Sequence, residues 1–173
     1  MRNFCDGKVY YEPRFPNLLF AIDGEVYTFQ KRKYIVIGGA ESIDKSLCIA
    51  NNKPYWDDEV PGAETKALVE DKLNFLGNTV YGVLTHTCPH RYVPTEMFLS
   101  ARKNIPGAKK KHNKKLQLYT PYIDRTTEKW LDIIYDTIEY EVWFCGHYHI
   151  DKEIEDITML HNEICPLYME KTE

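Results

Sequence analysis

The sequence predicts a mixed α/β fold in a single domain that spans residues 1–173. Short runs rich in β-branched and aromatic residues alternate with two longer stretches of helical periodicity. Histidines stand directly behind two of the predicted strands. With 173 residues, of which 43% are hydrophobic, the chain is long enough to bury one ordinary core.

The first third of the chain predicts strands followed by irregular structure. Apolar, β-prone runs at 18–22 and 26–29 flank an Asp-Gly dipeptide, which is typical of tight hairpin turns, so we expect these two runs to pair. A further strand is predicted at 34–37. Residues 41–62 are polar and rich in turn formers, which indicates a loop.

Two helices are predicted at 64–76 and 126–138. In the first, Leu68, Lys72 and Phe75 lie on adjacent turns with Leu73 and Leu76 beside them. In the second, an apolar stripe at helical spacing is marked by Trp130, Ile133, Ile134 and Ile138. Strands are predicted at 80–84, 141–145, 157–160 and 163–167, and a short helix at 95–103.

Three histidines form the candidate functional motif. His86 follows the strand at 80–84, and His147 and His149 follow the strand at 141–145, behind Gly146. Residues two apart on an extended segment point to the same face about 7 Å apart, so two such imidazoles suit metal ions about 3.5–4 Å apart. We expect Gly146 to permit the sharp turn that directs them into a cleft.

The other histidines have a more ordinary interpretation. A lone histidine is most often a surface or hydrogen-bonded residue, and we interpret His90, His112 and His161 in this way. A structural zinc site formed by Cys88, His90, Cys145 and His147 is a second metal hypothesis. Its spacing differs from that of zinc fingers, so small buried cysteines are the favoured interpretation.

Composition excludes several classes of protein. The net charge of −4 gives no overall field that attracts nucleic acid or an anionic membrane, and no apolar stretch approaches the length of a membrane span. The basic run at 109–115 lacks interleaved aromatic residues and is interpreted as a solvated loop. Five scattered cysteines are typical of free thiols in a reducing compartment, so we expect a cytoplasmic protein.

Four segments together resemble a known family. They are Gly-Gly-Ala-Glu-Ser-Ile-Asp-Lys at 38–45, Trp-Asp-Asp-Glu at 56–59, Leu-Thr-His-Thr-Cys-Pro at 84–89 and Trp-Phe-Cys-Gly-His-Tyr-His at 143–149. In this order the chain resembles the calcineurin-like metallophosphoesterases, and more narrowly their bacterial and phage branch.

The resemblance implies a β-sandwich flanked by helices that hydrolyses phosphate esters with a dinuclear centre of Mn, Fe or Zn. It also implies that His86 and His147 hold one metal ion and that His149 holds its neighbour.

The resemblance covers only the second half of the family domain. The family motifs Asp-x-His, Gly-Asp-x-x-Asp and Gly-Asn-His do not occur in this sequence, so the bridging carboxylate and other ligands are missing. Three neutral imidazoles are expected to bind metal weakly, one ion at a time.

Two function classes therefore follow from the sequence. The first is a phosphatase or phosphodiesterase whose site is completed by an N-terminal half, encoded upstream or carried by a second polypeptide. The second is a catalytically inactive half-domain that binds a partner. A lone half is expected to expose an apolar sheet face, which self-association or a partner would cover.

Overall fold

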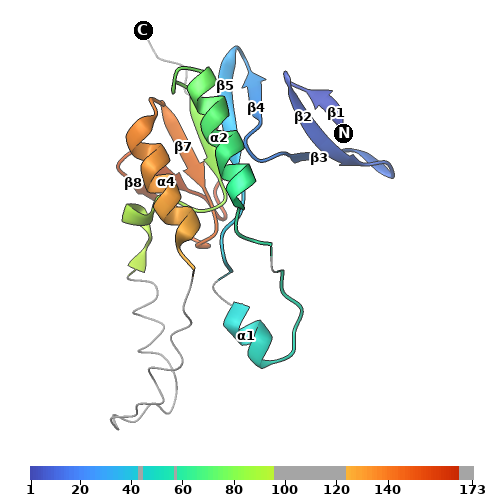
Figure 1. The fold of residues 1–173 in the computed structure, drawn as a ribbon, viewed down its shortest axis with the longest axis vertical. Helices are drawn as coiled ribbons and strands as arrows, with labels where there is room; N and C mark the ends of the chain where they lie inside the picture. The colour runs from blue at the N-terminus through green and yellow to red at the C-terminus, as the bar shows by residue number, and fades with distance from the viewer. Residues whose placement is uncertain (43–44, 57, 96–123, 168–173) are drawn as a thin grey trace.

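The computed structural model describes residues 1–42, 45–56, 58–95 and 124–167 (Figure 1). The strands are β1 (Arg2–Phe4), β2 (Gly7–Glu12), β3 (Phe15–Ala21), β4 (Val26–Phe29), β5 (Arg32–Ile37), β6 (Gly82–Thr85), β7 (Val142–Cys145), β8 (Lys152–Ile154) and β9 (Ile157–Met159). The helices are α1 (Lys45–Ala50), α2 (Ala63–Phe75) and α4 (Thr126–Thr137), with a short 3₁₀ helix η1 (His90–Tyr92). This content confirms the predicted mixed α/β class.

A six-stranded mixed sheet in the order β4-β5-β6-β7-β9-β8 is the centre of the fold. Strands β5, β6, β7 and β9 pair in parallel, while β4 and β8 pair antiparallel at the two edges. The carboxyl ends of the four parallel strands therefore meet at one edge of the sheet. In open α/β sheets this edge is where ligands usually bind.

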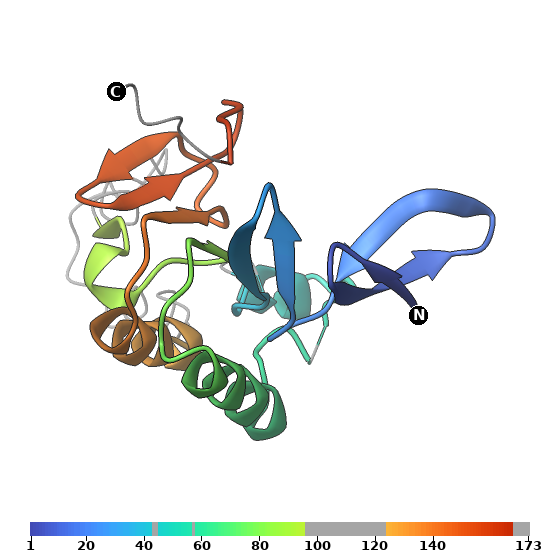
Figure 2. The same ribbon diagram turned by 90° about the horizontal axis from the view of Figure 1, so that it is seen from above.

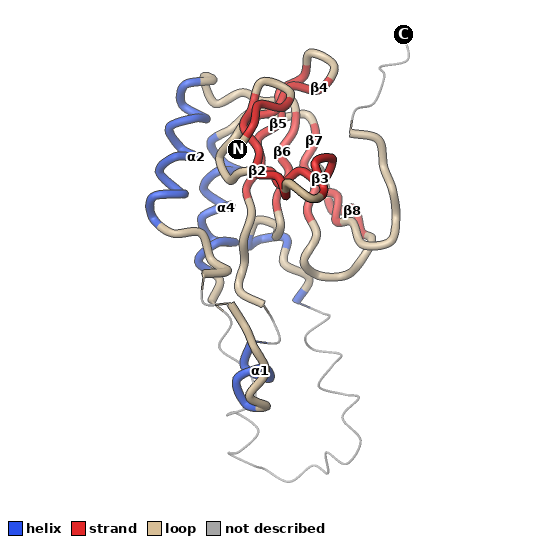
Figure 3. Tube along the Cα trace, turned by 90° about the vertical axis from the view of Figure 1, so that its right-hand side faces the viewer, coloured by secondary structure: helices blue, strands red, loops and turns tan. Residues whose placement is uncertain are grey.

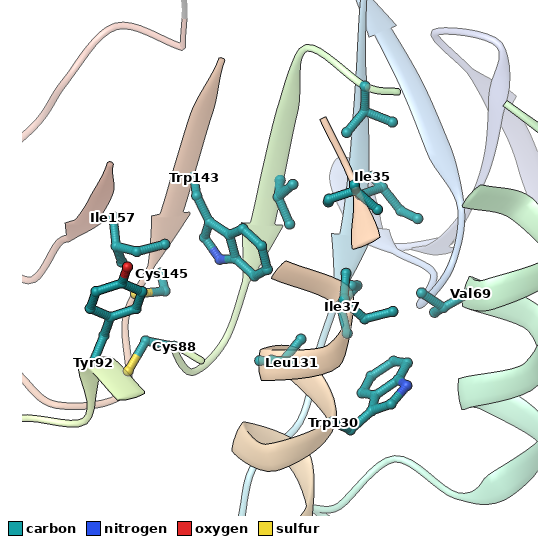
Figure 4. Close-up of a cluster of buried hydrophobic side chains, with 14 of the residues drawn as sticks. Ile35, Ile37, Val69, Cys88, Tyr92, Trp130, Leu131, Trp143, Cys145 and Ile157 are labelled. Carbon is teal, nitrogen blue, oxygen red and sulfur yellow. The ribbon is translucent and has the colours of Figure 1, made fainter. Parts of the chain in front are cut away.

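Helices α2 and α4 lie side by side on one face of this sheet (Figures 2 and 3). A row of apolar side chains in register across the parallel strands, each 0% exposed, packs against them; it consists of Ile35, Val83, Trp143 and Ile157. Val69 from α2 and Leu131 from α4 join the same core (Figure 4). Burying such large side chains provides the main free energy of folding.

The predicted hairpin around the Asp-Gly dipeptide is wrong. A turn does form there, since the N–H of Glu25 donates to the carbonyl of Ile22, but it connects two different sheets. Strand β4 instead pairs with β5 through a two-residue turn at Gln30 and Lys31, which both adopt positive φ. A two-residue turn in which both residues have positive φ matches the twist of a hairpin. Neither residue of this turn is glycine, so the sequence does not indicate it.

The predicted helices are confirmed, but the apolar stripe predicted for the second helix is partly wrong, and the first buries only some of the apolar residues named for it. Helix α2 buries Val69 and Leu73, whereas Leu68 and Phe75 are 46% and 88% exposed. Helix α4 buries Trp130, Leu131 and Ile134, and Ile138 directly after it, whereas Ile133 is 63% exposed. Consecutive helical residues lie about 100° apart, so residues beside the true stripe turn away from the sheet.

A separate three-stranded antiparallel sheet, in the order β1-β2-β3, lies beyond the β4 edge of the large sheet (Figures 1 and 2). The N–H of Thr28 donates to the carbonyl of Cys5, which links the two sheets. Several large apolar side chains of the small sheet are exposed: Phe4, Tyr10, Tyr11, Phe15, Leu18 and Phe20. This sheet therefore offers much apolar surface to solvent.

Residues 163–167 form no strand, contrary to prediction. The chain does return to the large sheet there, since the hydroxyl of Tyr34 on β5 donates a hydrogen bond to the carbonyl of Leu167. The predicted helix at 95–103 and the basic run at 109–115 lie essentially outside the described residues. All five cysteines are free thiols. Within the described ranges, no helix combines the length and apolarity needed to cross a membrane.

The core and the corrected helix face lead to a first prediction. Leu131→Ala is expected to lower the free energy of unfolding by about 3 kcal/mol, because it leaves a cavity under the sheet. Ile133→Ala, a matched apolar truncation in the same helix, is expected to change it by less than about 0.5 kcal/mol. Urea unfolding of both variants measures this, and equal losses would contradict the assigned face.

Candidate metal site

The candidate histidines lie at the carboxyl edge of the parallel strands. His86 follows β6, and the segment from Gly146 to His149 follows β7. Backbone pairing continues past the strand ends, since the N–H of His86 donates to the carbonyl of Ile37 (3.1 Å) and the N–H of Gly146 donates to the carbonyl of His86 (3.0 Å). The sheet register is thus carried into both histidine loops.

The structure brings His86 and His147 together. Nδ1 of His147 lies 3.0 Å from Nε2 of His86, and the ring centroids are 4.9 Å apart in an edge-to-face arrangement. Nε2 of His147, on the other side of the ring from Nδ1, is buried and has no hydrogen-bond partner among the described residues. A metal ion shared with His86 would instead be bound by Nδ1 of His147 and Nε2 of His86, the two nitrogens that face each other.

His149 does not join this pair. Its ring stacks on that of His161, with centroids 5.0 Å apart. His161 follows β9, the next parallel strand along the sheet, and was expected to be an ordinary surface or hydrogen-bonded residue. The signal that was missed is its place directly behind the strand predicted at 157–160, which is comparable with that of His86 behind the strand at 80–84.

The backbone of the His-Tyr-His segment differs from expectation. His147 and His149 have φ values of 71° and 54°, so the segment is not extended, and their side chains reach different neighbours. Gly146 does not have a positive φ, and a Cβ added there would meet no atom closer than 3.7 Å. The histidines themselves therefore make the turn, in a conformation uncommon outside glycine and often found at functional sites.

Both paired imidazoles favour the neutral form. Desolvation, followed by the effects of His86, Arg125 and His149, lowers the pKa of His147 from 6.5 to about 4. Desolvation also lowers the pKa of His86, while the carboxylates of Glu59 and Glu128 oppose that shift. A neutral imidazole is the form that binds a metal ion.

The described residues do not form a complete ligand set. Among them, no three histidine, cysteine or acidic side chains converge on a point that would hold a metal ion. The structure places the thiols of Cys88 and Cys145 within hydrogen-bond distance of each other. The zinc hypothesis still gains no support, because His90 is exposed on η1 and no third ligand converges with them among the described residues.

Comparison with models of protein families, with curated proteins and with solved structures found no match to this chain. The assignment to a family therefore depends on the sequence segments and on the arrangement of the histidines, and it is a proposal.

The pKa of His147 leads to a second prediction. Because this pKa is lower in the folded chain than in the unfolded chain, the unfolded chain binds more protons below pH 6.5, and stability falls as the pH falls from 6.5 towards 4. With EDTA present, the free energy of unfolding is expected to fall by an amount on the order of 2 kcal/mol over this pH range. His147→Asn should show a shallower dependence in urea unfolding at several pH values, and parallel curves would contradict the prediction.

Proposed function

We propose that this chain contributes to a metal-dependent phosphoesterase, a phosphatase or phosphodiesterase, in which His86 and His147 bind one divalent metal ion. The observation that carries the proposal is the 3.0 Å approach of two imidazole nitrogens at the ends of adjacent parallel strands. It agrees with the pairing that the family resemblance implies for these two residues.

Two properties of the pair fit a metal ion. The rings are neutral near pH 7 because of their lowered pKa values. The pair also lies at the carboxyl edge of the sheet, where α/β proteins usually bind ligands. These donors suit Mn, Fe or Zn, and a bound divalent ion would stabilise the charge that develops on phosphoryl oxygens.

The remaining metal ligands would come from another polypeptide segment, because the described residues do not complete the site. His149, stacked on His161, is proposed to bind the second ion once such a segment is present. In that arrangement a second sheet would pack on the large sheet to form the implied β-sandwich. The face opposite the helices carries partly exposed apolar residues in register: Val36, Leu84 and Phe144.

A second candidate function is that of a catalytically inactive module that binds a partner. The observation that favours it is the exposed apolar surface of the small sheet, where Phe15, Leu18 and Phe20 are each at least half exposed. Large exposed apolar patches usually mark interaction sites. The two candidates predict different metal binding, so they can be separated.

Metal binding provides the third prediction. Titration with Co²⁺ or Mn²⁺ by calorimetry is expected to give weak binding of about one ion per chain, because only two imidazoles converge in the described part of the chain. His86→Ala and His147→Ala are each expected to weaken binding about tenfold or more. His90→Ala, which removes an exposed histidine at the nearby η1, is the matched control and should bind as the original chain does.

Either of two results would contradict the metal site: no measurable binding to the original chain, or equal affinities for all three variants. Elemental analysis after purification with manganese and zinc present gives an independent stoichiometry. Hydrolysis of bis-p-nitrophenyl phosphate in the presence of Mn²⁺ then distinguishes an active site from a bound but unreactive ion.

The exposed apolar surface provides the fourth prediction. Sedimentation velocity at moderate protein concentration is expected to show self-association, because association would remove this surface from water. Phe20→Ser and Leu18→Ser on β3 should shift the distribution towards the monomer. A monodisperse monomer for the original chain would contradict self-association, and Phe75→Ser, on the exposed side of α2, controls for a general change in solubility.

A further inference from the structure

The carboxylate of Glu128 is the most unusual buried group of the described residues. Its side chain is 0% exposed, and the other buried polar residues of the described part are Thr87 and Thr127. Burying a carboxylate is costly unless hydrogen bonds or opposite charges compensate it. Its Oε2 atom nevertheless has no hydrogen-bond partner among the residues that the structure describes. A carboxylate with this cost calls for an explanation other than simple packing.

The partners of Glu128 come from both histidine loops. Its Oε1 accepts a hydrogen bond from the Thr87 hydroxyl at 3.2 Å and a longer one from the Tyr148 hydroxyl at 3.4 Å. The two hydroxyls lie 2.9 Å from each other, which closes a triangle of oxygen atoms. Because each hydroxyl has one proton, only two of the three contacts are hydrogen bonds at any moment. Nη1 of Arg125 lies 3.6 Å from Oε1 and balances part of the charge.

The sequence positions of these partners connect the triangle to the histidine pair. Thr87 directly follows His86, and Tyr148 directly follows His147. One carboxylate on α4 therefore holds the chain neighbours of both members of the imidazole pair. The rings of His147 and Tyr148 are also in contact, with centroids 4.9 Å apart.

Stability alone does not account for this arrangement. Helix α4 is already anchored by buried Trp130, Leu131 and Ile134. Replacing buried charged groups by apolar ones is often neutral or stabilising, so a buried carboxylate is a poor choice for an anchor. Hydrogen bonds that orient ligand side chains, in contrast, need directional partners.

We infer that Glu128 is a positioning residue, which sets the separation and orientation of His86 and His147 by holding Thr87 and Tyr148. We call this arrangement of Glu128, Thr87 and Tyr148 the clamp. Its role in metal binding rests on the proposed metal site, whereas its effect on the imidazole pair does not require a metal. The clamp acts from α4 across the ends of β6 and β7.

The first experiment uses the chain with EDTA and follows the imidazole protons by NMR. The hydrogen-bonded pair is expected to give a downfield N–H proton that disappears in His86→Ala and His147→Ala. Glu128→Gln, which keeps the shape of the side chain, is expected to remove or strongly shift that signal. Glu70→Gln is the matched control, because Glu70, on α2, accepts a hydrogen bond from Trp130 Nε1 at 2.7 Å and not from either histidine loop.

The second experiment measures Co²⁺ affinity and the visible spectrum of the bound ion. Glu128→Gln is expected to weaken binding about 10- to 100-fold, which is the usual effect of removing a group that orients metal ligands. Thr87→Val and Tyr148→Phe should each weaken it in the same direction, and they test the clamp if Glu128→Gln does not fold. Leu131→Ala destabilises the same helix without touching the triangle and should keep the original affinity while folded.

The two experiments separate this inference from the proposed function. If the original chain binds no Co²⁺, the metal site fails, and the NMR signal alone decides about the clamp. If the original chain binds Co²⁺ but Glu128→Gln, Thr87→Val and Tyr148→Phe all keep its affinity and NMR signal, the clamp is overturned. It is also overturned if Leu131→Ala weakens binding as much as Glu128→Gln does.

Discussion

The parallel pairing of β5, β6, β7 and β9 is the constraint on which the rest of the structure depends. It brings segments from distant parts of the sequence to one edge, and backbone hydrogen bonds extend it past the strand ends to His86 and Gly146. The buried row through Ile35, Val83 and Trp143 fixes the register, because a slip by one residue would turn these side chains to the opposite face. The distance between the two imidazoles is a consequence of that register.

Apolar and polar burial have different roles in this molecule. The large side chains under α2 and α4 provide stability, as expected for a close-packed core. The polar triangle of Thr87, Glu128 and Tyr148 lies at the end of the same core, next to the candidate site. A group that is expensive to bury and adjacent to a pair of neutral imidazoles is better explained by orientation of those rings than by stability.

The fold also leaves apolar surface uncovered. The small sheet exposes Tyr10, Phe15 and Phe20, while Val36, Leu84 and Phe144 lie partly exposed on the face of the large sheet without helices. Both surfaces lie outside the packed core between sheet and helices. This division suits a chain that meets another polypeptide, which would remove the apolar surface from water.

The sequence by itself determined the α/β class, the two helices and most strands of the large sheet, because these depend on local periodicity. It also singled out His86 and His147, since each stands behind an apolar run. Only the tertiary structure decided which side chains meet. The pairing of β4 with β5, the outward position of Ile133, the stacking of His149 on His161 and the burial of Glu128 all depend on contacts between distant segments. The hydrophobic pattern of one segment carries no information about the surface that another segment presents to it.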